Sequence, residues 1–159
     1  MRWLSRFAQP TAPVKPLHGC EVRRARGEAE LAEALALRYE VFCREQGVPE
    51  RDERDGRDGE GVHLVAVANG RLVGTCRLVM VDRLAQFSRL AVARSARRQG
   101  IATALLDAAD REARAAGARR IVLHAQTYAR PLYERAGYRQ CGPEFVEAGI
   151  RHVAMEKLL

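Results

Sequence analysis

Two alternating apolar runs that meet at Asn69-Gly70 constrain the fold more than any other feature of the sequence. Val62–Ala68 and Arg71–Val81 each place apolar side chains at alternate positions, which is typical of strands. Asn and Gly both tolerate the positive φ that a two-residue hairpin turn requires. The sequence therefore predicts an antiparallel hairpin here, and Leu84–Val92 predicts a further strand.

The period of the apolar pattern changes after residue 92. Residues 101–116 form an Ala-rich pattern with helical spacing, which Gly117 ends in the manner of a C-cap. Another helical pattern begins at Glu28 and runs out near Gly47 and Pro49. Shorter segments complete the chain, namely strands at 20–26, 120–126 and 151–158 and a helix at 129–135 closed by Gly137.

The order of these elements is strand, helix, several antiparallel strands, helix, strand, helix, strand. This order predicts an α+β fold with one central mixed sheet and helices packed on it. The 159 residues suffice for one domain. Residues 1–19 carry four prolines or glycines and no periodic pattern, so we expect a flexible N-terminal tail there and one folded domain over 20–159.

The composition excludes several classes of partner. The net charge is +7, but the arginines are scattered and form no basic block with interleaved aromatics, so we expect no nucleic acid partner. No apolar run approaches the ~20 residues that span a bilayer, and a cytoplasmic protein is expected. The cysteines form no Cys-x-x-Cys pair and read as small buried hydrophobes rather than metal ligands; they are Cys20, Cys43, Cys76 and Cys141.

The segment 49–61 is all charge and glycine apart from its ends, and it is rich in Asp. A calcium loop of the EF-hand type needs oxygen ligands at alternate positions before its glycine. Arg54 and Arg57 interrupt the acidic positions here and would place positive charge where a cation should sit. We therefore expect a solvated loop and no metal.

The run Arg97-Arg98-Gln99-Gly100-Ile101-Ala102 lies between a predicted strand and a predicted helix. A helix N-terminus leaves about four backbone N–H groups unpaired and carries about half a positive charge. Gly100 lets the backbone approach a bulky anion, and the two arginines add positive charge. The run suits a pyrophosphate site, although a tight turn with solvated arginines would explain it equally well.

Three segments in the right order give this chain a resemblance to the GNAT acetyltransferases. Arg97 to Ala102 resembles the Q/R-x-x-G-x-G/A motif of that family. The preceding Ser88-Arg89-Leu90-Ala91-Val92 is similar to the strand that leads into the motif. Leu132-Tyr133-Glu134-Arg135-Ala136-Gly137-Tyr138 is similar to the downstream Y-x-x-x-G-F/Y segment. The resemblance covers residues 20–159.

A closer resemblance to the ElaA-type subgroup rests on three shorter segments. They are Leu37-Arg38-Tyr39-Glu40-Val41-Phe42 with Glu45-Gln46, His124-Ala125-Gln126, and Glu147-Ala148-Gly149-Ile150-Arg151-His152. The Arg-Tyr-Glu-Val-Phe part of the first segment is also similar to the acyl-homoserine-lactone synthases, which share the fold, so a longer acyl donor stays open.

The GNAT resemblance implies acetyl-CoA as the co-substrate and a central sheet that splays at the cofactor cleft, with helices on both faces. The backbone of the strand before the motif would pair with the pantetheine arm as an added strand does, and the amides that follow would hold the pyrophosphate. The implied cofactor-binding residues are Leu90, Ala91, Val92, Arg97, Arg98, Gln99, Gly100, Ile101, Ala102 and Thr103.

The resemblance also implies catalytic residues. The hydroxyl of Tyr133 would protonate the departing thiolate. Many GNAT enzymes place a Glu base on the strand before the motif, where Gln86 stands here, and an amide cannot serve as a base. His124, Glu144, Glu147 and His152 are the alternatives, and His124 is attractive because imidazole titrates near neutrality. The candidate substrate-binding residues are Arg38, Phe42, Gln46, Gln126 and Glu144, and Glu147 is a further acidic candidate.

The expected function is therefore transfer of an acetyl group to a primary amine by direct attack in a ternary complex. The acceptor would be a small molecule or a peptide. Rival hypotheses are an acyltransferase that uses a longer acyl-CoA or an acyl carrier protein, and a CoA-binding module without catalysis. A homodimer formed through a sheet edge is also compatible with the sequence.

Overall fold

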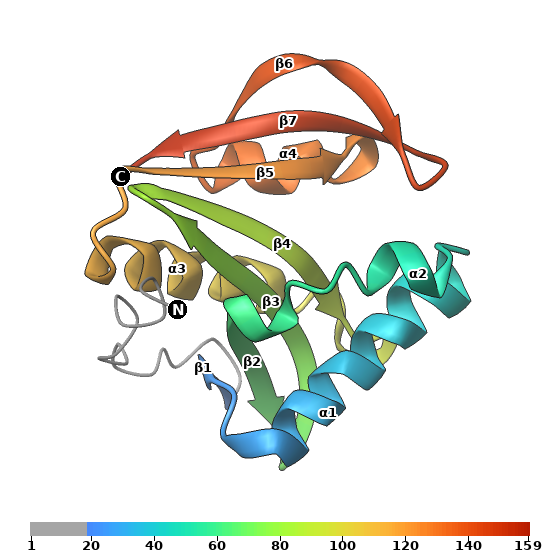
Figure 1. Cartoon of the computed structure of the whole chain (residues 1–159). Coiled ribbons are helices and arrows are strands. Elements are labelled where there is room, and N and C mark those ends of the chain that lie inside the picture. Colours follow the sequence, from blue (N-terminus) through green and yellow to red (C-terminus); the bar gives the residue numbers. More distant parts are fainter. Residues whose placement is uncertain (1–18) are drawn as a thin grey trace.

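The computed structural model describes residues 19–159 (Figure 1). The predicted tail therefore lies outside the described residues except for Gly19. The domain is an α+β fold built on one seven-stranded sheet of order β1-β2-β3-β4-β5-β7-β6. The strands are β1 (Cys20–Arg24), β2 (Val62–Ala68), β3 (Arg71–Val81), β4 (Leu84–Val92), β5 (Arg120–Gln126), β6 (Arg139–Glu147) and β7 (Ile150–Leu158).

Helices cover both faces of this sheet, as the resemblance implied. In Figure 1, α1 crosses in front of β2 and β3, whereas α3 lies behind them. Helix α3 packs closely against β3 at Gly74, since a Cβ on Gly74 would come within 2.9 Å of Ile101 and 3.0 Å of Leu105. The helices are α1 (Gly27–Arg38), a π-helix (Tyr39–Glu45), α2 (Glu50–Glu53), α3 (Ile101–Ala115), α4 (Arg130–Arg135) and 3-10 turns at Asp58–Glu60, Arg94–Ala96 and Thr127–Ala129.

The sheet opens between β4 and β5. These two strands are parallel and pair only where Leu84, Ala85 and Gln86 meet 120–122, so their remaining residues diverge. Beyond this pairing, β4 also carries a β-bulge against β3, because Thr75 pairs with Ala91 but Arg77 pairs with Ser88. The splay predicted at the cofactor cleft is confirmed.

The turn and cap signals of the sequence are confirmed. Asn69 and Gly70 both have positive φ values, 51° and 73°, in the turn that joins β2 to β3. Helix α3 starts directly after Gly100, and Gly117 follows its end with φ 83°. The first helix runs past Arg38 as predicted, but its last part is the π-helix.

Two sequence predictions were wrong in local structure. Strand β6 was missed because its side chains are mostly exposed and a register shift breaks its pairing between Gln140 and Glu144, so it lacks a core-facing alternation. The segment 49–61 is not simply a solvated loop. It forms α2 and a 3-10 turn, and the side chain of Glu53 is buried.

The cysteine prediction holds only in part. Cys20 and Cys76 are buried, Cys43 is partly buried, and Cys141 on the edge strand β6 is exposed. No helix among residues 19–159 is long and apolar enough to cross a membrane. Within the same range, no group of three or more His, Cys, Asp or Glu side chains is arranged to hold a metal ion.

Candidate active site

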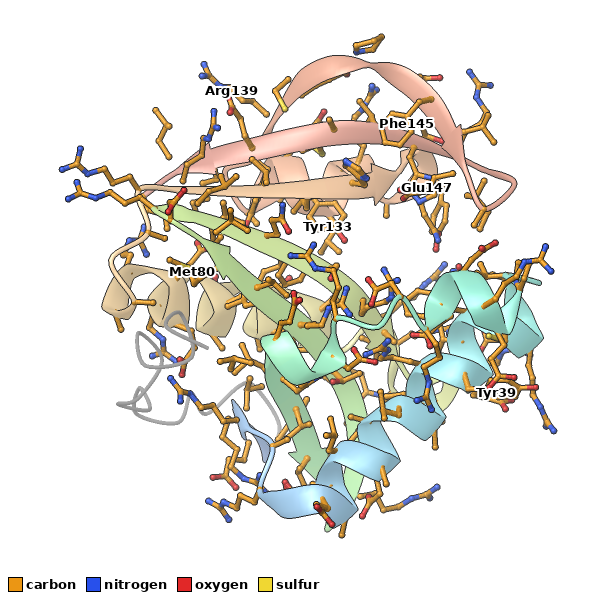
Figure 2. All side chains as sticks on the ribbon, in the orientation of Figure 1. Tyr39, Met80, Tyr133, Arg139, Phe145 and Glu147 are labelled. Carbon is orange, nitrogen blue, oxygen red and sulfur yellow. The ribbon has the colours of Figure 1, made fainter. Side chains whose placement is uncertain are left out.

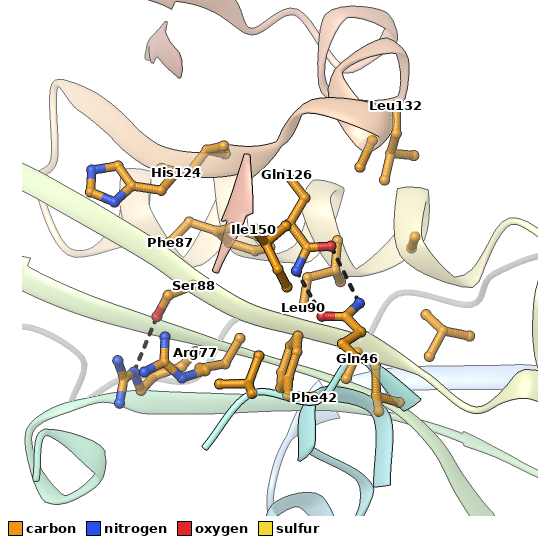
Figure 3. Close-up of a pocket in the computed structure, with 18 of the residues that line it drawn as sticks. Phe42, Gln46, Arg77, Phe87, Ser88, Leu90, His124, Gln126, Leu132 and Ile150 are labelled. Atoms are coloured by element: carbon orange, nitrogen blue, oxygen red, sulfur yellow. Dashed lines mark hydrogen bonds between the residues drawn. The ribbon is translucent and has the colours of Figure 1, made fainter. Parts of the chain in front are cut away.

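A cavity of about 1480 Å³ occupies the splay between β4 and β5 (Figure 3). Its walls come from β4, β5, the first turn of α3, the π-helix, the segment 51–57 and the β6–β7 turn. Most predicted site residues line it. They are Phe42, Gln46, Leu90, Ala91, Val92, Arg97, Arg98, Gly100, Ile101, Ala102, Thr103, His124, Gln126, Tyr133 and His152. Three predicted residues do not line it, namely Arg38, Gln99 and Glu144.

One end of the cavity is the start of α3. Gly100 precedes the helix with φ 79°, a left-handed conformation that suits glycine, and a Cβ there would meet nothing within 4 Å. The first turn of α3 contains no acidic residue. The N–H groups of this turn have no intrahelical partner, and its residues line the cavity together with Gly100 and Arg98, as an anion site requires.

Arg97, the first residue of the motif, is engaged by a carboxylate. Its Nη2 lies 2.8 Å and 3.0 Å from the two carboxylate oxygens of Glu45, and its Nε donates to the carbonyl of Val92 at 3.0 Å. Glu45 ends the π-helix. Arg97 thus ties the π-helix to the motif strand, and its charge is partly neutralised.

Tyr133 lies between β5 and β4 (Figure 2). Its ring packs edge-on against Phe87 and Tyr138, with centroids 6.4 Å and 6.0 Å away. Its hydroxyl makes no hydrogen bond to the described residues, and burial raises the pKa of Tyr133 above its ordinary value. The site therefore holds a neutral phenol whose donor is free for a ligand.

Glu147 lies between two imidazoles. Its Oε1 is 3.2 Å from Nδ1 of His124, and its Oε2 is 3.8 Å from Nε2 of His152. His152 is buried and His124 is half exposed. Phe145 packs against both rings, and Figure 2 places Phe145 and Glu147 at the end of the β6–β7 hairpin toward α2.

The tautomer of His152 follows from its other contact. Its Nδ1 lies 2.7 Å from the carbonyl oxygen of Ile150, and a carbonyl only accepts, so Nδ1 carries a proton. In the neutral ring, Nε2 then has a free lone pair. His152 therefore presents a base nitrogen on the cavity wall.

A pair of amides bridges the cavity. Gln126 Nε2 donates to Gln46 Oε1 at 2.7 Å, and Gln46 Nε2 donates to Gln126 Oε1 at 3.3 Å. Figure 3 shows the two side chains meeting in front of Leu90. The bridge joins the end of the π-helix to the end of β5.

The wall opposite β5 is fixed by an ion-pair network. Arg77 on β3 binds Asp55 and Asp58, while Arg89 of the β-bulge donates to the backbone carbonyls of Asp52 and Glu53. These contacts hold the segment that carries α2 against the sheet.

Arg38 belongs to this network rather than to the cavity. Its side chain is 1% exposed and binds Glu53 and Asp58. The structure therefore does not support Arg38 as a substrate ligand. Glu144 is instead paired with Arg151 on the exposed face of the β6–β7 hairpin.

Sequence reasoning missed Glu45, Asp55, Arg57 and Arg77 as cavity residues. One signal existed for Arg77, which is a charged residue in the middle of a mostly apolar strand. A buried guanidinium requires carboxylate partners, and the acidic segment 49–61 supplies them. Nothing in the sequence indicated that Glu45 would pair with Arg97, or Arg57 with Gln86.

The splayed sheet, the glycine before α3 and the buried tyrosine define an acyltransferase of the α+β class. A family model of the acetyltransferase (GNAT) domain matches residues 25–159. The chain therefore belongs to the GNAT acetyltransferase family. It is 37% identical over 134 residues to the uncharacterized N-acetyltransferase YjcF of Bacillus subtilis (strain 168), a match that covers 84% of this chain and 96% of that protein.

Solved structures share the fold. An acyl-CoA N-acyltransferase from Pseudomonas aeruginosa is 28% identical with a TM-score of 0.76, and the match covers 87% of this chain and 98% of that one. Escherichia coli ElaA is 23% identical with a TM-score of 0.77, covering 87% and 99% of the two chains.

Proposed function

We propose that the protein transfers an acetyl group from acetyl-CoA to a primary amine by direct attack in a ternary complex. One observation carries the proposal: the glycine-led start of α3 and the splay of β4 from β5 open into a single cavity that also contains Tyr133 and His152. The donor site, a hydrogen-bond donor for the leaving thiolate and a base thus share one cavity. We further propose a cytoplasmic location and the ElaA-type subgroup, as expected from the sequence.

The donor would lie along β4. The backbone of Leu90, Ala91 and Val92 lines the cavity beyond the last pairing of β4 with β5, so an extended pantetheine arm can pair there as an added strand does. The pyrophosphate would meet the amides from Arg98 to Thr103. Arg98 has a positive φ of 60° and makes no ion pair among residues 19–159, so its guanidinium is free for a phosphate.

The acceptor must lose a proton before it attacks. An alkyl amine with a pKa of about 10.4 costs about 4.6 kcal/mol to deprotonate at pH 7. Nε2 of His152 would take this proton. The carboxylate of Glu147, 3.8 Å away and held by His124, would stabilise the resulting imidazolium. The amine nitrogen then bonds to the acetyl carbonyl carbon, and the bond from that carbon to sulfur breaks.

Tyr133 would stabilise the leaving thiolate by donating a hydrogen bond to sulfur. An ordinary thiol has a pKa of about 8.5, below the ordinary phenol value of about 10, and burial raises the pKa of Tyr133 further. Complete transfer of the phenolic proton to sulfur is therefore uphill. The thiolate would take its final proton from the attacking nitrogen, which must lose one to become a neutral amide.

A turnover assay with a panel of primary amines tests the proposal, with acetyl-CoA, a long-chain acyl-CoA and an acylated carrier protein as donors. Product should be followed by mass spectrometry, because the exposed thiol of Cys141 would consume a thiol reagent. Acetyl transfer to an amine supports the proposal. Turnover with the long-chain or carrier-protein donor alone selects a longer-chain acyltransferase, and binding of donor without turnover selects a non-catalytic module.

A further inference from the structure

Arg57 projects into the cavity at the end away from the motif. It follows α2, and its Nη1 donates to Oε1 of Gln86 at 2.8 Å. Gln86 stands on β4, next to Val122 of β5, at the last paired position before the splay. Gln86, which stands where many GNAT enzymes have the base, therefore accepts a hydrogen bond from the guanidinium of Arg57.

The backbone of Arg57 is fixed in place. Its N–H donates to Oδ1 of Asp55 at 3.0 Å across Gly56, which has φ 77°. Asp55 is held in turn by Arg77, with Nη1 2.8 Å from Oδ1 and Nη2 2.7 Å from Oδ2. Because the turn is anchored to β3, the guanidinium of Arg57 is pre-organised before any ligand arrives.

The charge of Arg57 is only weakly compensated. Asp55 and Asp58 are both engaged by Arg77, and Gln86 is neutral. Glu60 binds Nε at 3.0 Å, but both side chains are well exposed, 38% and 48%, and such pairs contribute little. Nη2 of Arg57 makes no hydrogen bond within residues 19–159, so two N–H donors are available.

We propose that Arg57, oriented by Gln86, binds a carboxylate of the acceptor. This inference rests on the proposed function, in which the pantetheine arm lies along Leu90, Ala91 and Val92. Gln86 is four positions before Leu90 on the same strand, and a β-bulge lies between them, with Arg89 at a φ of 60°. The strand is therefore not extended over this span, and Gln86 lies closer to Leu90 than the roughly 13 Å of four extended residues. The substrate class is an amine that also carries a carboxylate.

Linear ω-aminoalkanoic acids and their carboxamides test this proposal. We would measure kcat/KM for glycine, β-alanine and longer members, each beside its amide. The acid should be preferred over its amide by about tenfold or more, as for a hydrogen bond to a charged group, in at least one member of the series.

Variants separate the subsite from the chemistry. Arg57→Gln should remove the preference by lowering kcat/KM for the acids and leaving the amides unchanged, and Arg57→Lys should retain part of it. Arg54→Gln is the matched control, because Arg54 lies on the same segment but outside the cavity lining. Acetyl-CoA affinity should be the same in all four proteins.

The outcomes are distinct. Equal use of acids and amides by the wild type, turnover of neutral amines alone, or an unchanged preference in Arg57→Gln overturns the subsite and leaves the proposed function standing. No turnover of any amine by a protein that binds acetyl-CoA overturns both.

Discussion

Arg77 holds the carboxylate of Asp55 through both of its oxygens, at 2.7 Å and 2.8 Å. The contact joins the floor of the cavity, on β3, to the segment that forms its opposite wall. Arg77 is almost fully buried, with 4% of its side chain exposed, so the pair is screened little by solvent. The wall of the cavity is thus held by charge rather than by apolar packing.

Asp55→Asn should lower the free energy of unfolding at pH 7 by about 2 kcal/mol, because Arg77 loses a charged partner. Arg77 lowers the pKa of Asp55 below its unfolded value. That contribution is therefore present above the unfolded pKa and is lost as pH falls toward the folded one. Urea unfolding at pH 7 and pH 3 should show a smaller difference from wild type at pH 3. Asp52→Asn is the control, and an equal difference at both pH values would contradict the assignment.

Tyr133→Phe should lower kcat by about 10²-fold or more and leave the affinity for acetyl-CoA unchanged. The ring still packs against Phe87 and Tyr138, so only the donor is lost. Initial rates and calorimetric titration measure the two quantities. Tyr138→Phe is the matched control, because the hydroxyl of Tyr138 donates to Asp110 at 3.2 Å and neither residue lines the cavity. Loss of the Tyr138 hydroxyl should therefore lower stability and leave turnover unchanged. Full activity in Tyr133→Phe would remove the tyrosine from the mechanism.

His152→Gln should lower kcat by about 10²-fold at pH 7. The amide of Gln can still donate to the carbonyl of Ile150 but cannot accept a proton. The deficit should shrink as pH rises toward 10, where the amine is already deprotonated. His124→Gln should have a smaller effect, because His124 is at the exposed end of the cluster. A deficit that is constant across pH would mean that His152 is not the base.

The α+β fold was predictable because its main signals are local. The Asn69-Gly70 turn needs positive φ, Gly117 ends an Ala-rich helix, and burial alternates along β4 and β5. Strand β6 was not predictable in the same way. It lies at the sheet edge, its side chains face solvent, and an edge strand without a buried face has no alternation to detect.

The site was predictable where the motif is contiguous and not where partners are distant in sequence. Gly100 and Tyr133 stand within recognisable segments. The pairing of Gln86 with Arg57, or of Arg97 with Glu45, joins residues 29 and 52 positions apart. Sequence reasoning identified Gln86 as a departure from the family pattern but gave no indication of its partner. His124 and His152 were both candidates, and only the fold places Glu147 between them.

The most direct test of the account is calorimetric titration of the wild type, Gly100→Asn and Gly100→Glu with acetyl-CoA. The account predicts saturable binding to the wild type and none to Gly100→Glu, whose carboxylate would face the pyrophosphate. Gly100→Asn should bind acetyl-CoA more weakly than the wild type but still bind it, because Asn tolerates positive φ and its side chain is uncharged. Melting temperatures of the three proteins report whether the fold is retained. Unchanged affinity in a folded Gly100→Glu protein would contradict the account, because the donor would then lie somewhere other than the start of α3.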